Sequence, residues 1–469
     1  MPRHRPTGRR YDRAVRLTIV GGGGFRTPHV WEALLRDHAD PRVTQVVLHD
    51  TDRGRLDVME TVLRQQAEGF AGAPALHSTT DLRSALSGAD FVFAAIRVGG
   101  LEGRCLDEHV ALAHGVLGQE TTGAGGIAYA IRTVPAMLGL ARLIAEVAPT
   151  AYLLNFTNPA GIITEATQSV LGERSVGICD TPSGLGREVV AAVGADPGRV
   201  ALDYVGLNHL GWLRRVLVDG VDVLPGLLSD DERLGRLEDA ELFGTDFLRR
   251  LRSLPNEYLW YYYRGRESLA AIRAAGRTRG DYLRDSQTAF YADAAAQPAR
   301  AGTLWREVLG ARNASYLAEA RGAGSGDAAR ATAEAEPGAE GYAGVALAVM
   351  AAISRSEPSV HILNVRNGGS VTALPDDAVV EIPARVTAEG IRALPLTTQP
   401  DLHQLGLMAQ VKAVERHAIA AAVTGDPGEA LQAFALHPLV GSVDVAGRLL
   451  GAYAAAQPTF AAALGLRPA

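Results

Sequence analysis

The chain has 469 residues, of which 47% are hydrophobic and 21% are charged, and this length exceeds what one ordinary hydrophobic core needs, which predicts two domains. The formal net charge of −6 excludes a general nucleic-acid-binding function, because such a function requires a basic face. Two cysteines, Cys105 and Cys179, are too few for a disulfide framework and indicate a reducing, cytoplasmic compartment.

The N-terminal segment is basic, with six arginines in the first sixteen residues and no apolar segment directly after them. This pattern differs from that of a signal peptide, so we expect residues 1–15 to form a disordered, solvated tail. No apolar run approaches the roughly eighteen residues of a membrane span, and we expect no membrane partner.

Residues 16–50 contain the parts of a dinucleotide-binding unit in the required order. A β-rich run over 16–20 precedes four glycines at 21–24, a helix is predicted over 25–35, and a second strand over 43–48 ends near Asp50. Glycines at such a turn let the backbone approach a pyrophosphate at the helix N-terminus, and the acid binds the ribose. The fingerprint is imperfect, because its third glycine position is Arg26 and Asp50 lies 26 residues after Gly24. A plain tight turn is the alternative; an acid at position 50 favours NAD over NADP. The predicted cofactor-binding residues here are Gly21, Gly23, Gly24, Phe25, Arg26 and Asp50.

Three more predicted strands bring polar residues to the same sheet edge, since ligands of open α/β sheets bind at the carboxyl ends of parallel strands. After a short helix over 82–86, a strand over 90–96 ends at Arg97, which either meets an anionic ligand or is solvated. The strand over 152–156 ends in an asparagine turn, and the strand over 175–178 delivers Cys179. Between them, a glycine-dense loop over 118–126 opens a helix over 127–147 and either binds phosphate or ribose oxygens or only caps that helix.

The C-terminal half has a weaker pattern. A strand over 200–207 leads to His209. The Cys179 thiolate and the His209 imidazole could share a divalent metal, although two core residues are the alternative.

Tyr258 and Tyr262, four positions apart, are predicted on one helix face, as catalytic groups or as packing. Residues 264–284 are rich in arginine and form either a phosphate-binding face or a solvated helix. Residues 320–338 read as a mobile surface insertion. Strands over 360–366 and 378–383 and helices over 403–423 and 427–435 complete a second domain or a subunit interface.

The predicted fold class is therefore α/β. We expect an NAD-binding Rossmann-type parallel sheet over 16–195 and a mixed α+β, largely helical domain over 196–469 for substrate binding, catalysis and oligomerisation.

These landmarks, in this order, resemble glycoside hydrolase family 4, the NAD- and metal-dependent glycosidases. The matching segments are IVGGGG at 19–24, RVGG at 97–100, GQETTG at 118–123, NFTNPA at 155–160, CDTP at 179–182, NHLGW at 208–212, PNEYL at 255–259, LPDDAVVE at 374–381 and LHPLV at 436–440. The resemblance covers nearly the whole chain after residue 15 and is greatest to the 6-phospho-β-glucosidase branch.

The resemblance implies an exception to hydrolysis by two carboxylates. In this family NAD+ takes hydride from C3 of the sugar, a metal, typically Mn²⁺, polarises the C3 carbonyl, and a tyrosine removes the C2 proton. The aglycone then leaves by elimination, water adds, and the reduced cofactor returns the hydride. The expected substrate is a 6-phospho-β-glucoside, and the expected assembly is a homodimer or homotetramer.

The family pattern assigns a role to each matching residue. Cys179 and His209 match the metal ligands, and Tyr258 matches the base, with Tyr262 as the alternative. The expected substrate-binding residues are Arg97, Asn158, Asn208 and Arg279, with Arg277 as the alternative phosphate contact. Glu120 and Asn155 are expected at the cofactor. Family members specific for β-glucosides commonly carry asparagine at the position of Asp180, whereas aspartate there is frequent in 6-phospho-α-glucosidases and has been assigned as an acid. Asp180 is therefore either the general acid or a hydrogen-bond acceptor beside the metal.

Several other functions stay open at this stage. A 6-phospho-α-glucosidase or an unphosphorylated glycosidase of the same family fits most of the motifs. A plain NAD-dependent dehydrogenase would need no metal and would form NADH. A non-catalytic nucleotide-sensing protein or scaffold would bind the cofactor without turnover, and it would leave the Cys179–His209 pair unexplained.

Overall fold

The structure is a computed structural model that describes residues 14–314 and 341–466. Most of the tail predicted over 1–15, and all of the insertion predicted over 320–338, lie outside the described residues. The described strands form one 13-stranded sheet with the order β10-β8-β7-β12-β11-β6-β5-β4-β1-β2-β3, with β13 paired to β12 and β9 to β8. The parallel N-terminal strands and the largely helical remainder confirm the predicted fold class.

The N-terminal part contains the parallel strands of this sheet. Their bounds are β1 Val15–Val20, β2 Val43–His49, β3 Ala75–Thr79, β4 Phe91–Ala94, β5 Tyr152–Asn155 and β6 Ser175–Gly177. The helices are α1 Thr27–Arg36, α2 Arg53–Gln66, α3 Leu82–Leu86, α4 Gly100–Ala113, α5 Ala124–Val147, α6 Ala160–Leu171 and α7 Thr181–Val193, with 3₁₀ turns at Gly172–Arg174 and Pro197–Arg199. β4 and β5 are buried along their whole length, which explains their continuous apolar sequences.

Antiparallel strands from the C-terminal part continue the same sheet. They are β7 Val200–Leu207, β8 Leu210–Val218, β9 Val221–Asp222, β10 Leu254–Pro255, β11 Ser359–Arg366, β12 Val379–Thr387 and β13 Gly390–Ala393. β11 joins β6 where Asn364 pairs with Gly177, and β12 joins β7 where Glu381 pairs with Gly206. The sheet therefore runs across the boundary predicted near residue 195, and that division into domains stays a prediction.

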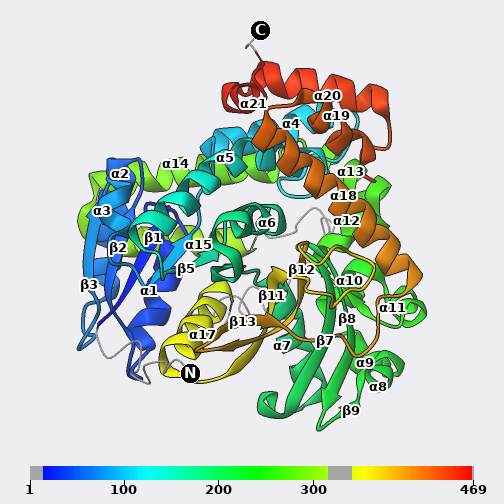
Figure 1. The fold of residues 1–469 in the computed structure, drawn as a ribbon, viewed down its shortest axis with the longest axis horizontal. Helices are drawn as coiled ribbons and strands as arrows, with labels where there is room; N and C mark the ends of the chain where they lie inside the picture. Colours follow the sequence, from blue (N-terminus) through cyan, green and yellow to red (C-terminus); the bar gives the residue numbers. More distant parts are fainter. Residues whose placement is uncertain (1–13, 315–340, 467–469) are drawn as a thin grey trace, which may run out of the picture.

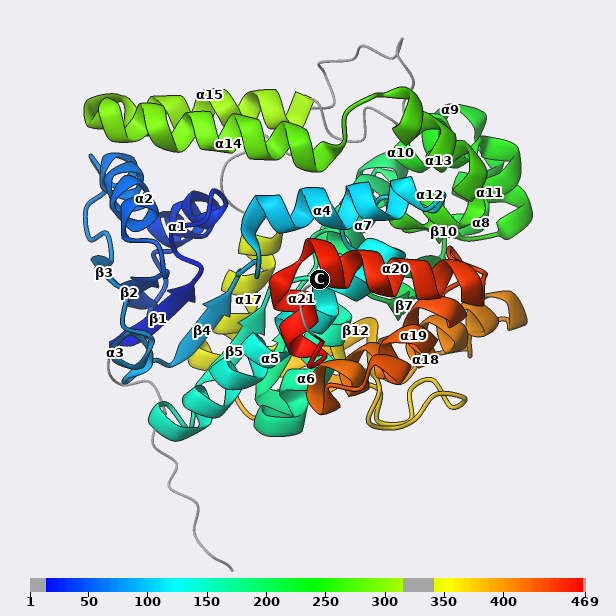
Figure 2. The ribbon, with the colours of Figure 1, turned by 90° about the horizontal axis from the view of Figure 1, so that it is seen from above.

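The C-terminal helices lie around the sheet. Their bounds are α8 Leu224–Ser229, α9 Asp231–Leu234, α10 Glu238–Phe243, α11 Thr245–Leu251, α12 Trp260–Tyr263, α13 Gly265–Ala274, α14 Arg279–Ala296, α15 Ala301–Ala314, α17 Tyr342–Arg355, α18 Leu402–Thr424, α19 Pro427–Leu436, α20 Val443–Ala456 and α21 Pro458–Ala463, with 3₁₀ turns at Glu257–Leu259 and Pro298–Arg300. α18 to α21, orange to red in Figure 1, pack on α4 and α5 of the N-terminal part. Figure 2 shows α14 and α15 side by side, and they contact α2 and, through α14, α4.

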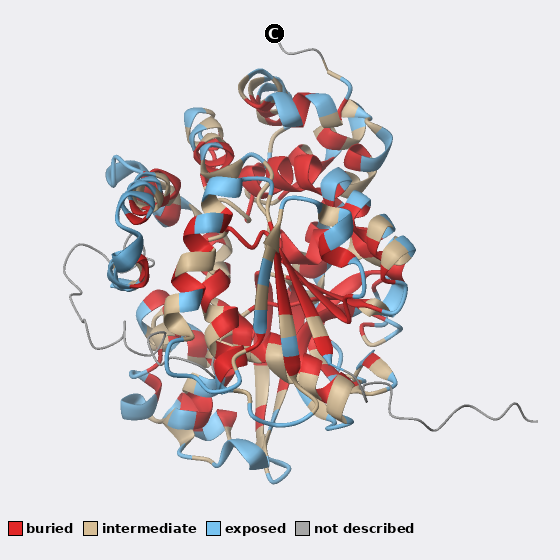
Figure 3. Cartoon of the chain, turned by 90° about the vertical axis from the view of Figure 1, so that its left-hand side faces the viewer, coloured by how far each residue is buried: buried red, intermediate tan, exposed pale blue. Residues whose placement is uncertain are grey.

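The core follows the sheet, whose central strands are buried while the outer helices present exposed faces (Figure 3). One described helix, α5, is long and apolar enough to cross a membrane, so the expectation that no apolar run reaches that length is wrong. Most of its apolar segment is nevertheless buried inside the fold, between α4, α6 and α18, as in the core helix of a soluble protein.

Candidate active site

A cavity of about 2,870 Å³ opens at the carboxyl ends of the parallel strands and extends between the two parts of the chain. Every site residue that the sequence predicts lines this cavity, except Gly23, Asn155 and the alternative base Tyr262. The prediction that parallel strands bring these residues to one sheet edge is therefore consistent with the observed geometry.

The glycine turn lies at one end of the cavity and has no room for side chains. Gly21 has φ 90°, and a Cβ there would lie 2.5 Å from the Ala95 carbonyl oxygen. The Gly23 amide donates to Asp50 Oδ2 at 3.1 Å, and its carbonyl accepts from the Tyr291 hydroxyl at 2.6 Å. Gly23 thus holds the loop in place instead of lining the cavity, and only glycine permits the close backbone contact at Gly21.

Phe25 and Arg26 follow the turn, and their side chains make different contacts. Phe25 is buried and packs edge-on against the Phe290 ring at 5.3 Å. The Arg26 guanidinium lies 5.5 Å from the Phe156 ring and 3.7 Å from Asp180. Arg26 thus connects the glycine-turn end of the cavity to the residue that follows Cys179.

Asn155 does not face the cavity. Its side chain is fully buried and donates to the carbonyl oxygen of Thr157 at 3.1 Å and to the Thr164 hydroxyl at 3.2 Å. Its own side-chain oxygen accepts from the Thr157 amide at 3.1 Å. These bonds shape the turn that presents Asn158 to the cavity, and they occupy the Asn155 side chain within that turn.

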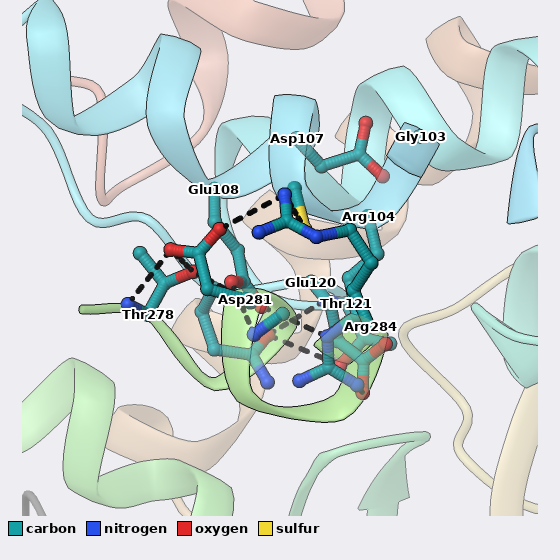
Figure 4. Close-up of polar contacts among 12 residues, drawn as sticks. Gly103, Arg104, Asp107, Glu108, Glu120, Thr121, Thr278, Asp281 and Arg284 are labelled. Atoms are coloured by element: carbon teal, nitrogen blue, oxygen red, sulfur yellow. Dashed lines mark hydrogen bonds and ion pairs between the residues drawn. The ribbon is translucent and has the colours of Figure 1, made fainter. Parts of the chain in front are cut away.

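Arg97 and Glu120 are partners in a buried ion network. Glu120 pairs with Arg97, and its second oxygen lies 2.8 Å from Arg104 Nη1. Burial alone would raise the pKa of Glu120, but the Arg104 and Arg97 guanidiniums outweigh it and lower the pKa to about 2. Glu120 is therefore a fixed anion that orients Arg97, and Figure 4 shows it among the polar contacts around α4.

His209 and Cys179 reach the same cavity from different strands. Cys179 follows β6, and His209 occupies the β7–β8 turn in a left-handed conformation, φ 62°. His209 Nδ1 lies 3.0 Å from the Thr121 hydroxyl, which leaves Nε2 as the nitrogen available to a metal. Burial lowers the pKa of His209 to about 4, so the ring is neutral, as a metal ligand must be.

The donor chemistry of this pair fits a divalent metal. Burial, with the charges of Glu381 and Asp180, raises the pKa of the Cys179 thiol well above its ordinary value. A thiolate at this position therefore needs a cation to stabilise it. The described part of the chain has no group of three or more possible metal ligands, and two protein ligands would leave coordination positions for substrate oxygens.

Tyr258 lies directly against the predicted metal ligand. Its ring stacks on His209 with centroids 3.7 Å apart and planes 8° apart. Burial, and then the charge of Glu257, raises its pKa well above 10, so these residues alone keep the phenol protonated. The expectation that Tyr258 and Tyr262 share a helix face is wrong, because Tyr258 lies in the 3₁₀ turn before α12. Tyr262 does not line the large cavity.

A buried polar network that the sequence did not reveal holds Tyr258. Asn256 accepts from the Tyr258 amide at 3.0 Å and donates to the Tyr204 hydroxyl at 3.2 Å. Tyr204 in turn donates to Glu381 Oε2 at 3.1 Å, and Glu381 Oε1 accepts from Asn208 at 3.3 Å. The network ties the Tyr258 turn to the segment before His209.

A cationic cluster faces another part of the cavity. Arg279 begins α14, donates to the Arg312 carbonyl oxygen at 2.9 Å and lies over the Tyr282 ring at 4.9 Å. Burial, followed by the nearby charges of Arg26 and Arg279, lowers the pKa of Arg312 to about 9. Neighbouring cations that lower each other's pKa in this way favour the binding of an anion. Arg312 was not predicted, because no local motif marks it.

Comparison with known proteins gives consistent matches along the chain. The model of the family 4 glycosyl hydrolases matches residues 16–195, and the model of their C-terminal domain matches residues 204–440. A probable 6-phospho-beta-glucosidase of Bacillus subtilis is 31% identical over 93% of this chain and 95% of its own.

Two solved structures are similar in fold and sequence. The 6-phospho-beta-glucosidase of Thermotoga maritima with NAD and glucose-6-phosphate has a TM-score of 0.79 and 28% identity, covering 95% of this chain and 99% of that one. A 6-phospho-alpha-glucosidase from gut microorganisms, in complex with NAD and Mn²⁺, has a TM-score of 0.76 and 27% identity, covering 94% and 97%.

Proposed function

The chain belongs to the family 4 glycosyl hydrolases, which confirms the resemblance in its motifs, and we propose that it hydrolyses 6-phospho-β-glucosides with NAD+ and Mn²⁺. The observation that carries this proposal is the meeting of a glycine turn, a Cys179–His209 pair and Tyr258 in one cavity. Relatives crystallised with NAD, Mn²⁺ and glucose-6-phosphate support the cofactors and the phosphorylated sugar.

Different residues of the cavity are proposed to bind the cofactor, the metal and the substrate. The turn at Gly21 to Gly24, with Asp50, would hold NAD+, and Cys179 with His209 would hold the metal. When bound, the two groups supply reversible oxidation at C3 of the sugar and Lewis-acid polarisation of the oxygen at that carbon. Arg97, Asn158 and Asn208 bind the sugar in this proposal, and Arg279 in the cationic cluster binds its phosphate.

Tyr258 is the proposed base for the C2 proton. Its turn is fixed by Asn256, and its ring is fixed by stacking on His209. Because the protein residues alone raise its pKa, Tyr258 needs positive charge nearby before it can accept this proton at neutral pH. Asp180, which lies 3.7 Å from Arg26, is the proposed general acid for the leaving oxygen, and a hydrogen-bond acceptor beside the metal is its alternative role.

The anomeric preference is the finer part of the proposal. The β-glucosidase of Bacillus subtilis and the overall motif pattern favour the β-anomer. Asp180 and relatives that act on α-glucosides favour the other anomer, among them a phospho-alpha-glucosidase of Clostridium acetobutylicum. A 6-phospho-α-glucosidase is therefore the second candidate; the cytoplasmic location and the homo-oligomer stay predictions.

The test uses p-nitrophenyl β- and α-glucoside 6-phosphates with NAD+ and Mn²⁺ each present or omitted. Release of p-nitrophenol and formation of NADH are followed in the same cuvette. Release from the β-anomer that requires both additives, without net NADH, is the expected result. Release from the α-anomer alone would assign the preference to Asp180, and stoichiometric NADH without phenol would indicate a dehydrogenase instead.

A further inference from the structure

Helix α4 carries a buried carboxylate whose two oxygens contact two different elements of the cavity wall, α4 itself and the start of α14. Glu108 is 2% exposed. Its Oε1 accepts from Arg104 Nε at 2.9 Å, and Arg104 also pairs with Glu120. Its Oε2 accepts from the backbone amide of Gly280 at 2.7 Å. One side chain therefore joins the Arg97–Glu120 side of the cavity to the start of α14.

The start of α14 is built to receive this carboxylate. A Cβ on Gly280 would lie 2.5 Å from Glu108 Oε2 and 3.3 Å from Arg104 Cγ, so only glycine permits the contact. A second tie lies beside it, since His109 Nε2 is 2.8 Å from Asp281 Oδ2. Figure 4 shows Arg104 and Glu108 on α4 facing Thr278 and Asp281 of the α14 cap.

The segment fixed in this way carries cations of the cavity wall. Arg279 immediately precedes Gly280, and Arg277 and Thr278 also line the cavity. A capping box between Thr278 and Asp281 closes the first turn of α14 and ties residues 278 to 281 together. The contact at Gly280 therefore sets where the Arg279 guanidinium lies relative to Arg97.

We propose that Glu108 is a positioning residue for the phosphate end of the site, which places Arg279 against the sugar phosphate through its contact with the Gly280 amide. This inference rests on the proposed function, because it assigns the phosphate to the Arg279 side. In this proposal Glu108 acts through Arg279.

The main variant is Glu108→Gln. The Glu108 carboxylate accepts hydrogen bonds from both Arg104 and the Gly280 amide. Glutamine has only one oxygen, so its NH₂ group would face one of these two donors and that hydrogen bond would be lost. The matched control is Glu102→Gln on the same helix, where the side chain is 75% exposed. The readouts are kcat and KM with the p-nitrophenyl glucoside 6-phosphate that the wild type prefers, inhibition constants for glucose 6-phosphate and for glucose, and the Kd for NAD+.

We expect Glu108→Gln to raise KM and the inhibition constant of glucose 6-phosphate by roughly tenfold, the loss of about one charge-assisted contact. The glucose inhibition constant and the Kd for NAD+ should stay close to wild type, and Glu102→Gln should match wild type throughout. Equal losses for glucose and glucose 6-phosphate, or no loss for either, would overturn the positioning role.

Gly280→Ala is the second variant, because it pushes the same segment away from an intact Glu108. We expect the same selective weakening, with partial recovery in Glu108→Asp/Gly280→Ala, where the shorter carboxylate leaves room for the methyl group. If neither single variant folds, the role is structural and the proposal fails. A wild type that does not prefer glucose 6-phosphate over glucose would instead refute the proposed phosphate specificity.

Discussion

Replacement of Glu120 by glutamine tests the electrostatics of the site directly. The side chain is 16% exposed and neutralises Arg97 and Arg104 together. Its pKa falls from 4.5 to about 2 in the folded protein, and one pKa unit corresponds to about 1.4 kcal/mol, so ionised Glu120 stabilises the fold by about 3 kcal/mol. Glutamine has the shape of the protonated acid, so Glu120→Gln should lower the free energy of unfolding at pH 7 by about that amount.

The pH dependence of this loss has a definite sign. Because the folded pKa is lowered, the stabilisation is complete above the unfolded pKa of 4.5 and is lost as the pH falls toward 2. The difference between wild type and Glu120→Gln should therefore be constant from pH 7 to about pH 5.5 and smaller by about 1.4 kcal/mol at pH 3.5. Urea unfolding followed by tryptophan fluorescence measures both values.

The matched control for this experiment is Glu146→Gln. Glu146 also accepts from guanidinium groups through both oxygens, but both of its hydrogen bonds come from one arginine, Arg83. That pair is exposed, so its loss should leave stability nearly unchanged. Equal destabilisation by the two variants, or a difference for Glu120→Gln that does not change between pH 7 and pH 3.5, would refute the ion network as the cause.

Three further substitutions separate the parts of the site. Tyr258→Phe should lower kcat by roughly a thousandfold, as expected for loss of a general base, while NAD+ still binds in a fluorescence titration. Cys179→Ser should weaken Mn²⁺ binding at least about tenfold by calorimetry, with the Kd for NAD+ unchanged; equal Mn²⁺ affinity would remove Cys179 as a ligand. Gly21→Ala should raise the Kd for NAD+ by more than about tenfold, since its Cβ would lie 2.5 Å from the Ala95 oxygen; unchanged NAD+ binding would exclude the turn as the cofactor site.

Local pattern was enough to predict the elements that carry the site. The apolar runs that became β1, β2, β4, β5 and β6 are buried strands, so their sequences are continuous and easily recognised. The edge strand β3 was missed because its sequence, ALHST, lacks an apolar run. The antiparallel strands that extend the sheet past β6 could not be placed, because their pairing is a long-range property of the fold.

Contacts between distant segments explain the errors at the site. Arg104 and Glu108 form an i,i+4 pair that the sequence displays, but the third partner is a main-chain amide 172 positions away and leaves no side-chain signal. Asn155 stands at a strand end, where a polar residue can serve a ligand or its own turn, and it serves the turn. Tyr258 was placed on a helix because residues 258 and 262 have helical spacing, yet Asn256 caps a 3₁₀ turn there.

Deuterium incorporation tests the redox-elimination mechanism most directly. The wild type hydrolyses its preferred glucoside 6-phosphate in D₂O with NAD+ and Mn²⁺, and the released sugar phosphate is analysed by NMR. Removal of the C2 proton by Tyr258 and its replacement from solvent predict deuterium at C2 of the product, and no turnover when NAD+ is omitted. A product that keeps hydrogen at C2, formed equally well without NAD+, would contradict the mechanism and indicate direct displacement at the anomeric carbon.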